Sequence, residues 1–164
     1  MNNKITDDID LCRWVAEELP IRFIGDEILL KRCEPFSAEE FKDKEIKDLA
    51  KDLISTLKKY REKAGTGRGL AANQIGISRR IIAVWLGQEP EIMVNPEIIS
   101  TQGEGSYWES CISSGALIIG EVIRPWQGVF KYQDLEGQIH TIEADEKQTR
   151  LLLHEIDQMS HMIR

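Results

Sequence analysis

The chain has 164 residues, of which 41% are hydrophobic and 30% are charged, the composition of an ordinary globular protein. This length predicts one domain, residues 1–164, with enough chain to bury a core. The formal net charge of −7 excludes a broad basic surface, so we expect neither a nucleic acid nor an anionic membrane as partner. No apolar run reaches the ~20 residues of a membrane span, and the acidic N-terminal stretch does not resemble a signal peptide, which predicts a cytoplasmic protein.

Helices are predicted in the first part of the chain. Over residues 6–19, apolar residues recur at roughly helical spacing. The stretch DEILLKRC (26–33) predicts a short extended segment. The sequence SAEE (37–40) has the form of a capping box, so a long helix is predicted over residues 37–64, and the glycines of GTGRG end it.

Strands are predicted in the second part. The stretches IIAVW (81–85), EIMVNPEII (91–99) and residues 128–144 are rich in apolar and β-branched residues, and LEGQ (135–138) predicts a hairpin turn. Residues 145–164 return to helical spacing. The order of helix, mixed strands and helix predicts an α+β fold.

Three separate stretches contain residue types found in catalytic sites, although each has a structural explanation when taken alone. GRGLAANQIG (67–76) is a glycine-bounded loop, which often reflects only tight packing. WESCISSG (108–115) contains Cys111, and a lone cysteine is most often an inert buried thiol. HEIDQ (154–158) begins like the H-E-x-x-H motif of metal-binding helices but lacks its second histidine.

Together, and in this order, the three stretches resemble the peptide deformylase family, with its motifs G-x-G-L-A-A-x-Q, E-G-C-L-S and H-E-x-D-H. MVNPEII (93–99) and EVIRP (121–125) are also similar to segments of that family. The resemblance extends from about residue 26 to the end and leaves residues 1–20 as an extra N-terminal segment. It implies a peptide-deformylase-like α+β fold, with mixed or antiparallel strands around a C-terminal metal-site helix and a long helix before the glycine loop.

The resemblance implies a metallohydrolase of protein biosynthesis, which removes the N-formyl group from N-formylmethionyl peptides or nascent chains. In the family one divalent metal, often Fe(II) with Zn or Ni as substitutes, activates the water that attacks the formyl carbon. Carried over, Cys111 and His154 are metal ligands, with Gln158 at the third position. Glu155 is then the general acid and base that moves the proton.

The same resemblance implies roles for four further residues. Gln74 and the backbone N–H of Ile112 stabilise the oxyanion. Gly69 and Arg124 help to seat the peptide.

The third ligand position departs from the family. Gln158 stands where the family has its second histidine, and an amide oxygen binds Fe(II), Ni or Zn less well than imidazole does. A loss of at least ~10–100-fold in metal affinity or activity is expected. His161 lies on nearly the same helix face as His154 but about 10.5 Å further along the axis, too far to share one ion. His140 belongs to no motif, and Ser110 replaces the glycine before Cys111.

These departures leave two functions open. The chain is either a deformylase weakened by the lost ligand, or a non-catalytic relative of the fold that binds a peptide or protein partner. In both cases we expect the protein to hold metal poorly. A third possibility, a core helix that contains a histidine and a glutamate by coincidence, does not explain the other two motifs.

Overall fold

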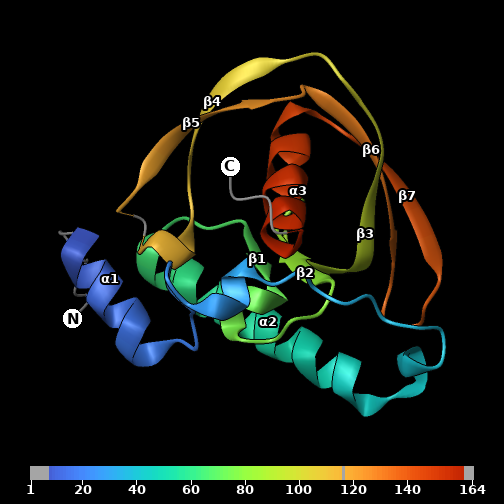
Figure 1. Ribbon diagram of the computed structural model, residues 1–164, viewed down its shortest axis with the longest axis horizontal. Coiled ribbons are helices and arrows are strands. Elements are labelled where there is room, and N and C mark those ends of the chain that lie inside the picture. The colour runs from blue at the N-terminus through green and yellow to red at the C-terminus, as the bar shows by residue number, and fades with distance from the viewer. Residues whose placement is uncertain (1–7, 116, 161–164) are drawn as a thin grey trace.

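The computed structural model describes residues 8–115 and 117–160 (Figure 1). Within these ranges the element order is α1, η1, η2, α2, β1, η3, β2, β3, β4, η4, β5, β6, β7 and α3, where η denotes a 3₁₀ helix. The helical elements are α1 (Asp8–Glu18), η1 (Glu27–Leu30), η2 (Glu40–Lys42), α2 (Lys44–Ala64), η3 (Ala72–Ile75), η4 (Ile112–Ser114) and α3 (Glu146–Met159). The expected mixture of helices and antiparallel strands, an α+β fold, is confirmed.

Two predictions for the N-terminal part were wrong in detail. Residues 26–33 do not form an extended segment, because the Asp26 carboxylate accepts the Ile28 N–H at 3.1 Å and closes the chain into η1. The long helix begins at Lys44 rather than at residue 37. Half of the expected capping box does form, since the Ser37 N–H donates to Glu40 Oε2 at 2.7 Å, but it leads into the short η2.

The larger sheet has five antiparallel strands in the order β1-β2-β3-β6-β7. Its strands are β1 (Gly69–Ala71), β2 (Ile81–Val84), β3 (Glu91–Gln102), β6 (Gln127–Gln133) and β7 (Ile139–Ala144). The predicted hairpin is confirmed, since β6 and β7 pair from Gly128↔Ala144 to Gln133↔Ile139. The short β1 was not predicted, because three residues are too few to show a period.

A second, two-stranded sheet continues the β3–β6 ribbon beyond a bend. It consists of β4 (Gly105–Ser110) and β5 (Ile119–Arg124), which form an arch over α3 (Figure 1). At the bend Gly103 has a φ of +75°, and a Cβ there would lie 2.6 Å from the Trp126 ring. Neither strand was predicted from the sequence, because an exposed two-stranded ribbon needs no continuous apolar run.

The β2 strand separates two hydrophobic clusters, because alternate side chains point to opposite faces of a sheet. Ile81 and Ala83 face the cluster that contains α2, whereas Ile82 and Val84 face the cluster that contains α3. The N-terminus of α3 is fixed by Asp145, whose carboxylate accepts the Gln148 N–H at 2.9 Å. The C-terminal helix is therefore held against the sheet at a defined position.

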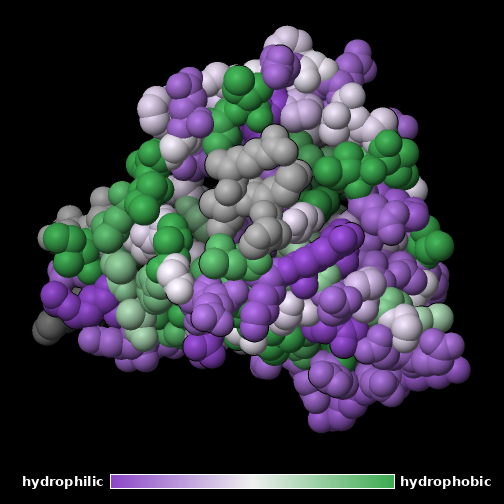
Figure 2. All heavy atoms as spheres, in the orientation of Figure 1, coloured by the Kyte–Doolittle hydropathy of each residue, from purple (hydrophilic) through white to green (hydrophobic). Residues whose placement is uncertain are grey.

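The surface has a hydrophilic part and a hydrophobic part. Hydrophilic residues dominate over α2, whereas hydrophobic residues gather on the β4–β5 side (Figure 2). The latter include Trp108, Ile119 and Ile123, each more than 60% exposed. Among the described helices, none is long and apolar enough to cross a membrane.

Candidate active site

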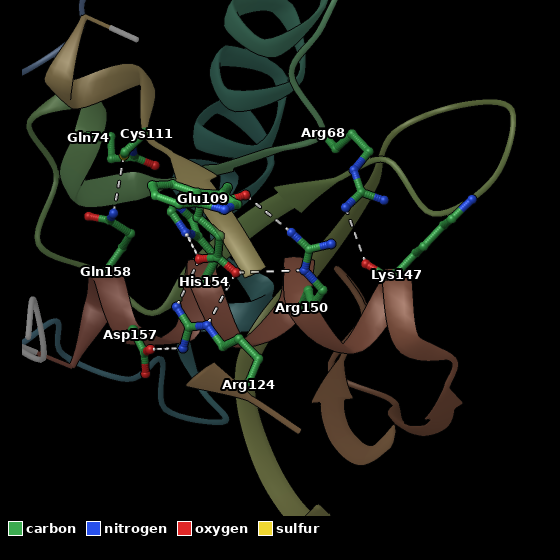
Figure 3. Close-up of polar contacts among 11 residues, drawn as sticks. Arg68, Gln74, Glu109, Cys111, Arg124, Lys147, Arg150, His154, Asp157 and Gln158 are labelled. Atoms are coloured by element: carbon green, nitrogen blue, oxygen red, sulfur yellow. Dashed lines mark hydrogen bonds and ion pairs between the residues drawn. The ribbon is translucent and has the colours of Figure 1, made fainter. Parts of the chain in front are cut away.

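The three sequence motifs meet at the sulfur atom of Cys111. Gln74 lies on η3, Cys111 precedes η4, and Gln158 lies on α3 (Figure 3). Gln74 Nε2 and Gln158 Nε2 each donate a hydrogen bond to Cys111 Sγ at 3.2 Å. Residues that lie 37 and 47 positions from the cysteine in the chain are thus brought to one point.

The side chain of Gln74 is fixed in direction by its remaining contacts. Its Oε1 accepts the Ala71 N–H at 2.8 Å, and its Nε2 also donates to Ser113 Oγ at 3.1 Å. The residue is almost fully buried. The amide can therefore present only N–H groups towards Cys111, and these groups suit a developing negative charge.

Glu109, at the end of β4, holds the imidazole of His154. Its Oε2 lies 2.9 Å from His154 Nδ1 and 3.1 Å from Arg124 Nη2. Arg124 is also ion-paired with Asp157, one helical turn from His154. A carboxylate on one imidazole nitrogen orients the other nitrogen, as is usual for a metal-binding histidine. The sequence assigned Glu109 no role, and its place in the cysteine motif was the only signal that could have found it.

The ionisation of His154 reflects these neighbours. Burial disfavours the protonated imidazole, but hydrogen bonds with Cys111 and Glu109, together with the charge of Glu155, outweigh it and raise the pKa of His154 to about 11. Without a metal the imidazole therefore carries a proton. A cation that binds here has to displace this proton, so its binding depends on pH.

Glu155 is a buried carboxylate with an unused acceptor. The residue is 3% exposed, and its Oε2 has no hydrogen-bond partner among the described residues. Burial is the largest of the effects that raise its pKa, to about 7. Gly69 makes room for it, because a Cβ on Gly69 would lie 2.1 Å from Glu155 Oε1. A carboxyl group with a pKa near neutrality can both accept and return a proton.

A cavity of about 280 Å³ opens in front of these groups. Two of its walls are the strand segment around Gly69 and the end of β4, and the α3 helix forms another. Its lining includes all three residues predicted to act catalytically and two arginines. The lining residues are Tyr60, Thr66, Gly67, Arg68, Gly69, Gln74, Trp108, Glu109, Ser110, Cys111, Ile112, Arg150, Leu151, His154 and Glu155.

A second cavity, of about 480 Å³, lies on the other side of the cysteine and histidine. It is lined by β5, by the end of β4 with the residues around η4, and by α3, and its apolar residues include Ile118, Val122 and Ile123. Gln158 lines this second cavity, whereas Glu155 and Gln74 line only the first. We call the two the Glu155 cavity and the Gln158 cavity.

The ligand set is short of one strong donor. In the described part of the chain, no three His, Cys, Asp or Glu side chains are grouped so that they could hold a metal ion. Cys111 and His154 offer two suitable donors. Gln158 turns its amide nitrogen towards Cys111, and its buried Oε1 has no hydrogen-bond partner among the described residues.

Some predicted residues have other neighbours than expected. Arg124 directs its guanidinium at Glu109 and Asp157 and lines only the Gln158 cavity, so its predicted contact with a peptide stays a prediction. His140 lies away from the site, against Asp134 at 2.7 Å. His161 lies outside the described residues.

Comparisons with known proteins agree with this geometry. The family model of polypeptide deformylase matches residues 18–163. A peptide deformylase of Thermoanaerobacter pseudethanolicus is 36% identical over 143 residues, which cover 87% of this chain and 84% of the relative. One from Dictyoglomus thermophilum is 37% identical over 143 residues, with 87% and 88% covered. The match begins at the end of α1, so almost all of that helix precedes it.

Solved structures of similar fold belong to the same group. The peptide deformylase of Thermotoga maritima superposes with a TM-score of 0.77 at 32% identity, over 86% of this chain and 90% of that one. The actinonin-bound class I type b enzyme of Acinetobacter baumannii gives a TM-score of 0.78 at 29% identity, over 88% and 93%.

Proposed function

Because the chain belongs to the polypeptide deformylase family, we propose that it removes the N-formyl group from peptides, with N-formylmethionyl peptides as the reference substrates. The observation that supports this most directly is the convergence of Gln74, Cys111 and Glu155 on one cavity. An amide N–H, a metal-binding thiol and a proton-exchanging carboxyl group are the parts that hydrolysis of a formamide needs. A single domain and a cytoplasmic location remain predictions.

The residues present fit a divalent cation, with one weak position. The family is one of metalloenzymes, and we propose Fe(II), with Zn or Ni as substitutes, held by Cys111 and His154. The unpartnered Oε1 of Gln158 becomes the third donor if the side-chain amide flips, so that its oxygen and nitrogen exchange places. Without a cation the nitrogen faces the sulfur because it can donate to it, and with a cation the oxygen is favoured. When bound, the cation supplies Lewis acidity at the water and at the formyl oxygen.

The chain's own groups then divide the reaction between them. Glu155 accepts a proton from the water as its oxygen adds to the formyl carbon, and returns the proton to the amine as the C–N bond breaks. The products are formate and the free N-terminus. The amide N–H of Gln74 and the backbone N–H of Ile112 donate to the formyl oxygen as it gains charge. Gly69 leaves room for the Glu155 carboxylate at the cavity that would take the peptide, and Arg124 keeps Glu109 and His154 in place.

The test combines formate release with metal analysis. Formyl tripeptides, one with Met and one with the acidic residue Glu in first position, are incubated with the wild-type protein and with Gln158→His. The metal content of both proteins is measured. We expect slow release and sub-stoichiometric metal in the wild type. In Gln158→His we expect metal affinity to rise by about 10–100-fold and turnover to rise with it.

Two results would contradict parts of this proposal. Near-stoichiometric metal in the wild type, with turnover that Gln158→His does not improve, would show that Gln158 is an adequate ligand. Metal-loaded Gln158→His that releases no formate would favour a binding protein of this fold over an enzyme.

A further inference from the structure

The Glu155 cavity contains positive charge that the proposed reaction does not use. Two of its lining residues are Arg68, which directly precedes β1, and Arg150, which lies on α3 (Figure 3). The Arg68 guanidinium donates to the Lys147 carbonyl at 3.2 Å and, among the described residues, forms no ion pair with a carboxylate. A guanidinium has five N–H donors, so most of those on Arg68 are available to a ligand.

Arg150 is held in place but only partly neutralised. Its guanidinium lies 4.0 Å above the Tyr107 ring, and its Nη2 donates to the Trp108 carbonyl at 3.4 Å. Its nearest carboxylate is Glu109, whose Oε1 is 4.0 Å from Arg150 Nε. Glu109 also contacts Arg124 at 3.1 Å and His154 at 2.9 Å, both closer than Arg150, so its charge is not reserved for Arg150. Arg150 Nε is buried without a hydrogen-bond partner among the described residues.

The position of these arginines bears on the substrate's first residue. In an N-formylated compound the Cα is two bonds from the formyl carbon, or about 2.5 Å away. When the formyl group reacts beside Glu155, which lines the Glu155 cavity and not the Gln158 cavity, we expect the groups on that Cα to lie in the Glu155 cavity. An apolar side chain there would displace water from guanidinium groups without replacing its hydrogen bonds, which is unfavourable. A carboxylate would replace them with charge-assisted bonds.

We propose that the preferred substrates are N-formylated compounds with a carboxylate close to the formyl-bearing nitrogen, and that Arg68, supported by Arg150, binds this carboxylate. The inference rests on the proposed deformylase function and narrows its substrate class. The carboxylate has two sources, an acidic side chain on the first residue or the α-carboxylate of a free N-formyl amino acid.

The experiment compares isosteric pairs. Formyl-Glu-Ala-Ser-amide is tested against formyl-Gln-Ala-Ser-amide and formyl-Met-Ala-Ser-amide, and N-formylmethionine against its amide, by formate release. Binding of the matching N-acetyl compounds is measured by calorimetry, which does not depend on turnover. One charge-assisted pair at a partly exposed site predicts about a tenfold preference for the carboxylate in one of the two pairs, expressed mainly in KM.

Arg68→Gln tests the assignment, and Arg32→Gln is its matched control. Both variants remove one positive charge, but only Arg68 lines the cavity. Arg68 is exposed, and among the described residues its side chain makes a single hydrogen bond, to the Lys147 carbonyl. The variant is therefore expected to fold, which its thermal midpoint checks. The preference for the carboxylate should fall to less than about threefold in Arg68→Gln and stay unchanged in Arg32→Gln.

The outcomes separate the two proposals. Equal binding within both pairs, Glu against Gln and N-formylmethionine against its amide, overturns the carboxylate site even if formate is released. A carboxylate preference that survives Arg68→Gln overturns the role of Arg68. Arg68-dependent binding of acidic N-acetyl compounds without formate release from any formyl compound supports the site and refutes the deformylase function. A preference confined to N-formylmethionine identifies the α-carboxylate as the source.

Discussion

The Glu155 cavity and the Gln158 cavity share a wall but differ in chemistry. Cys111 and His154 line both, together with Glu109 and Ser110. Besides these shared residues, the Glu155 cavity contains a proton-exchanging carboxyl group, the Gln74 amide and two arginines. The larger Gln158 cavity instead contains apolar side chains from β5 and from the residues just before it. The more spacious and more apolar cavity thus lacks the groups that hydrolysis requires. Of the two, the larger cavity is therefore not the one in which we place the reaction.

The largest expected effect comes from removing the carboxylate of the Glu155 cavity. Glu155→Gln keeps the shape of the side chain but cannot move a proton, and general acid–base catalysis contributes about 10²–10⁴-fold. We expect formate release to fall by that factor, with substrate binding by calorimetry nearly unchanged. A variant that keeps more than a tenth of wild-type kcat would remove the main reason to place the reaction in this cavity.

A glycine pair compares the two cavities more directly. A Cβ on Gly69 would lie 2.1 Å from Glu155 Oε1, whereas a Cβ on Gly120, which lines the Gln158 cavity, would meet no atom of the described residues within 4 Å. Overpacking of this kind costs about 1–3 kcal/mol. We expect Gly69→Ala to lose that much stability in urea unfolding and at least about tenfold in kcat/KM.

Gly120→Ala is the control for this clash. It should stay within about 0.5 kcal/mol of the wild type, as surface substitutions usually do. Equal effects of the two alanines would mean that Gly69 is not needed for the close approach of Glu155.

The dependence of stability on pH gives a smaller effect. Burial raises the pKa of Glu155 from its ordinary value of 4.5 to about 7, so the folded protein retains a proton that the unfolded chain has lost. Wild-type stability contributed by this group is therefore present below pH 4.5 and is lost as pH rises to about 7.

Glu155→Gln should reveal this contribution in the metal-free protein. The difference in unfolding free energy, variant minus wild type, is expected to rise between pH 4.5 and 7 and then to level off. A difference that does not change with pH would mean that the carboxyl group titrates normally and is more hydrated than its burial indicates.

The sequence predicted the features whose residue pattern lies within one short stretch of the chain. It did not predict the features that depend on contacts between residues far apart in the chain. The C-terminal helix, the long helix and the β6–β7 hairpin were predicted because their apolar spacing is local. Cys111, His154 and Gln74 were found through contiguous motifs. By contrast, Glu109 on His154 and Arg68 beside Lys147 are contacts across 45 and 79 residues, which no local pattern encodes. The two cavities also depend on β4 and β5, which a period-based prediction missed.

The smallest expected effect tests the apolar wall of the Gln158 cavity. Ile123 is 66% exposed and lines that cavity, so Ile123→Ser removes an apolar group that water already reaches. We expect a change in unfolding free energy within about 0.5 kcal/mol. Ile123 does not line the Glu155 cavity. We therefore expect kcat/KM for formyl peptides to change by less than about twofold, which corresponds to about 0.4 kcal/mol in activation free energy. A larger rise in KM for formyl-Met-Ala-Ser than for formyl-Glu-Ala-Ser would show that the apolar wall binds the methionine side chain, and the division of roles between the two cavities would have to be redrawn.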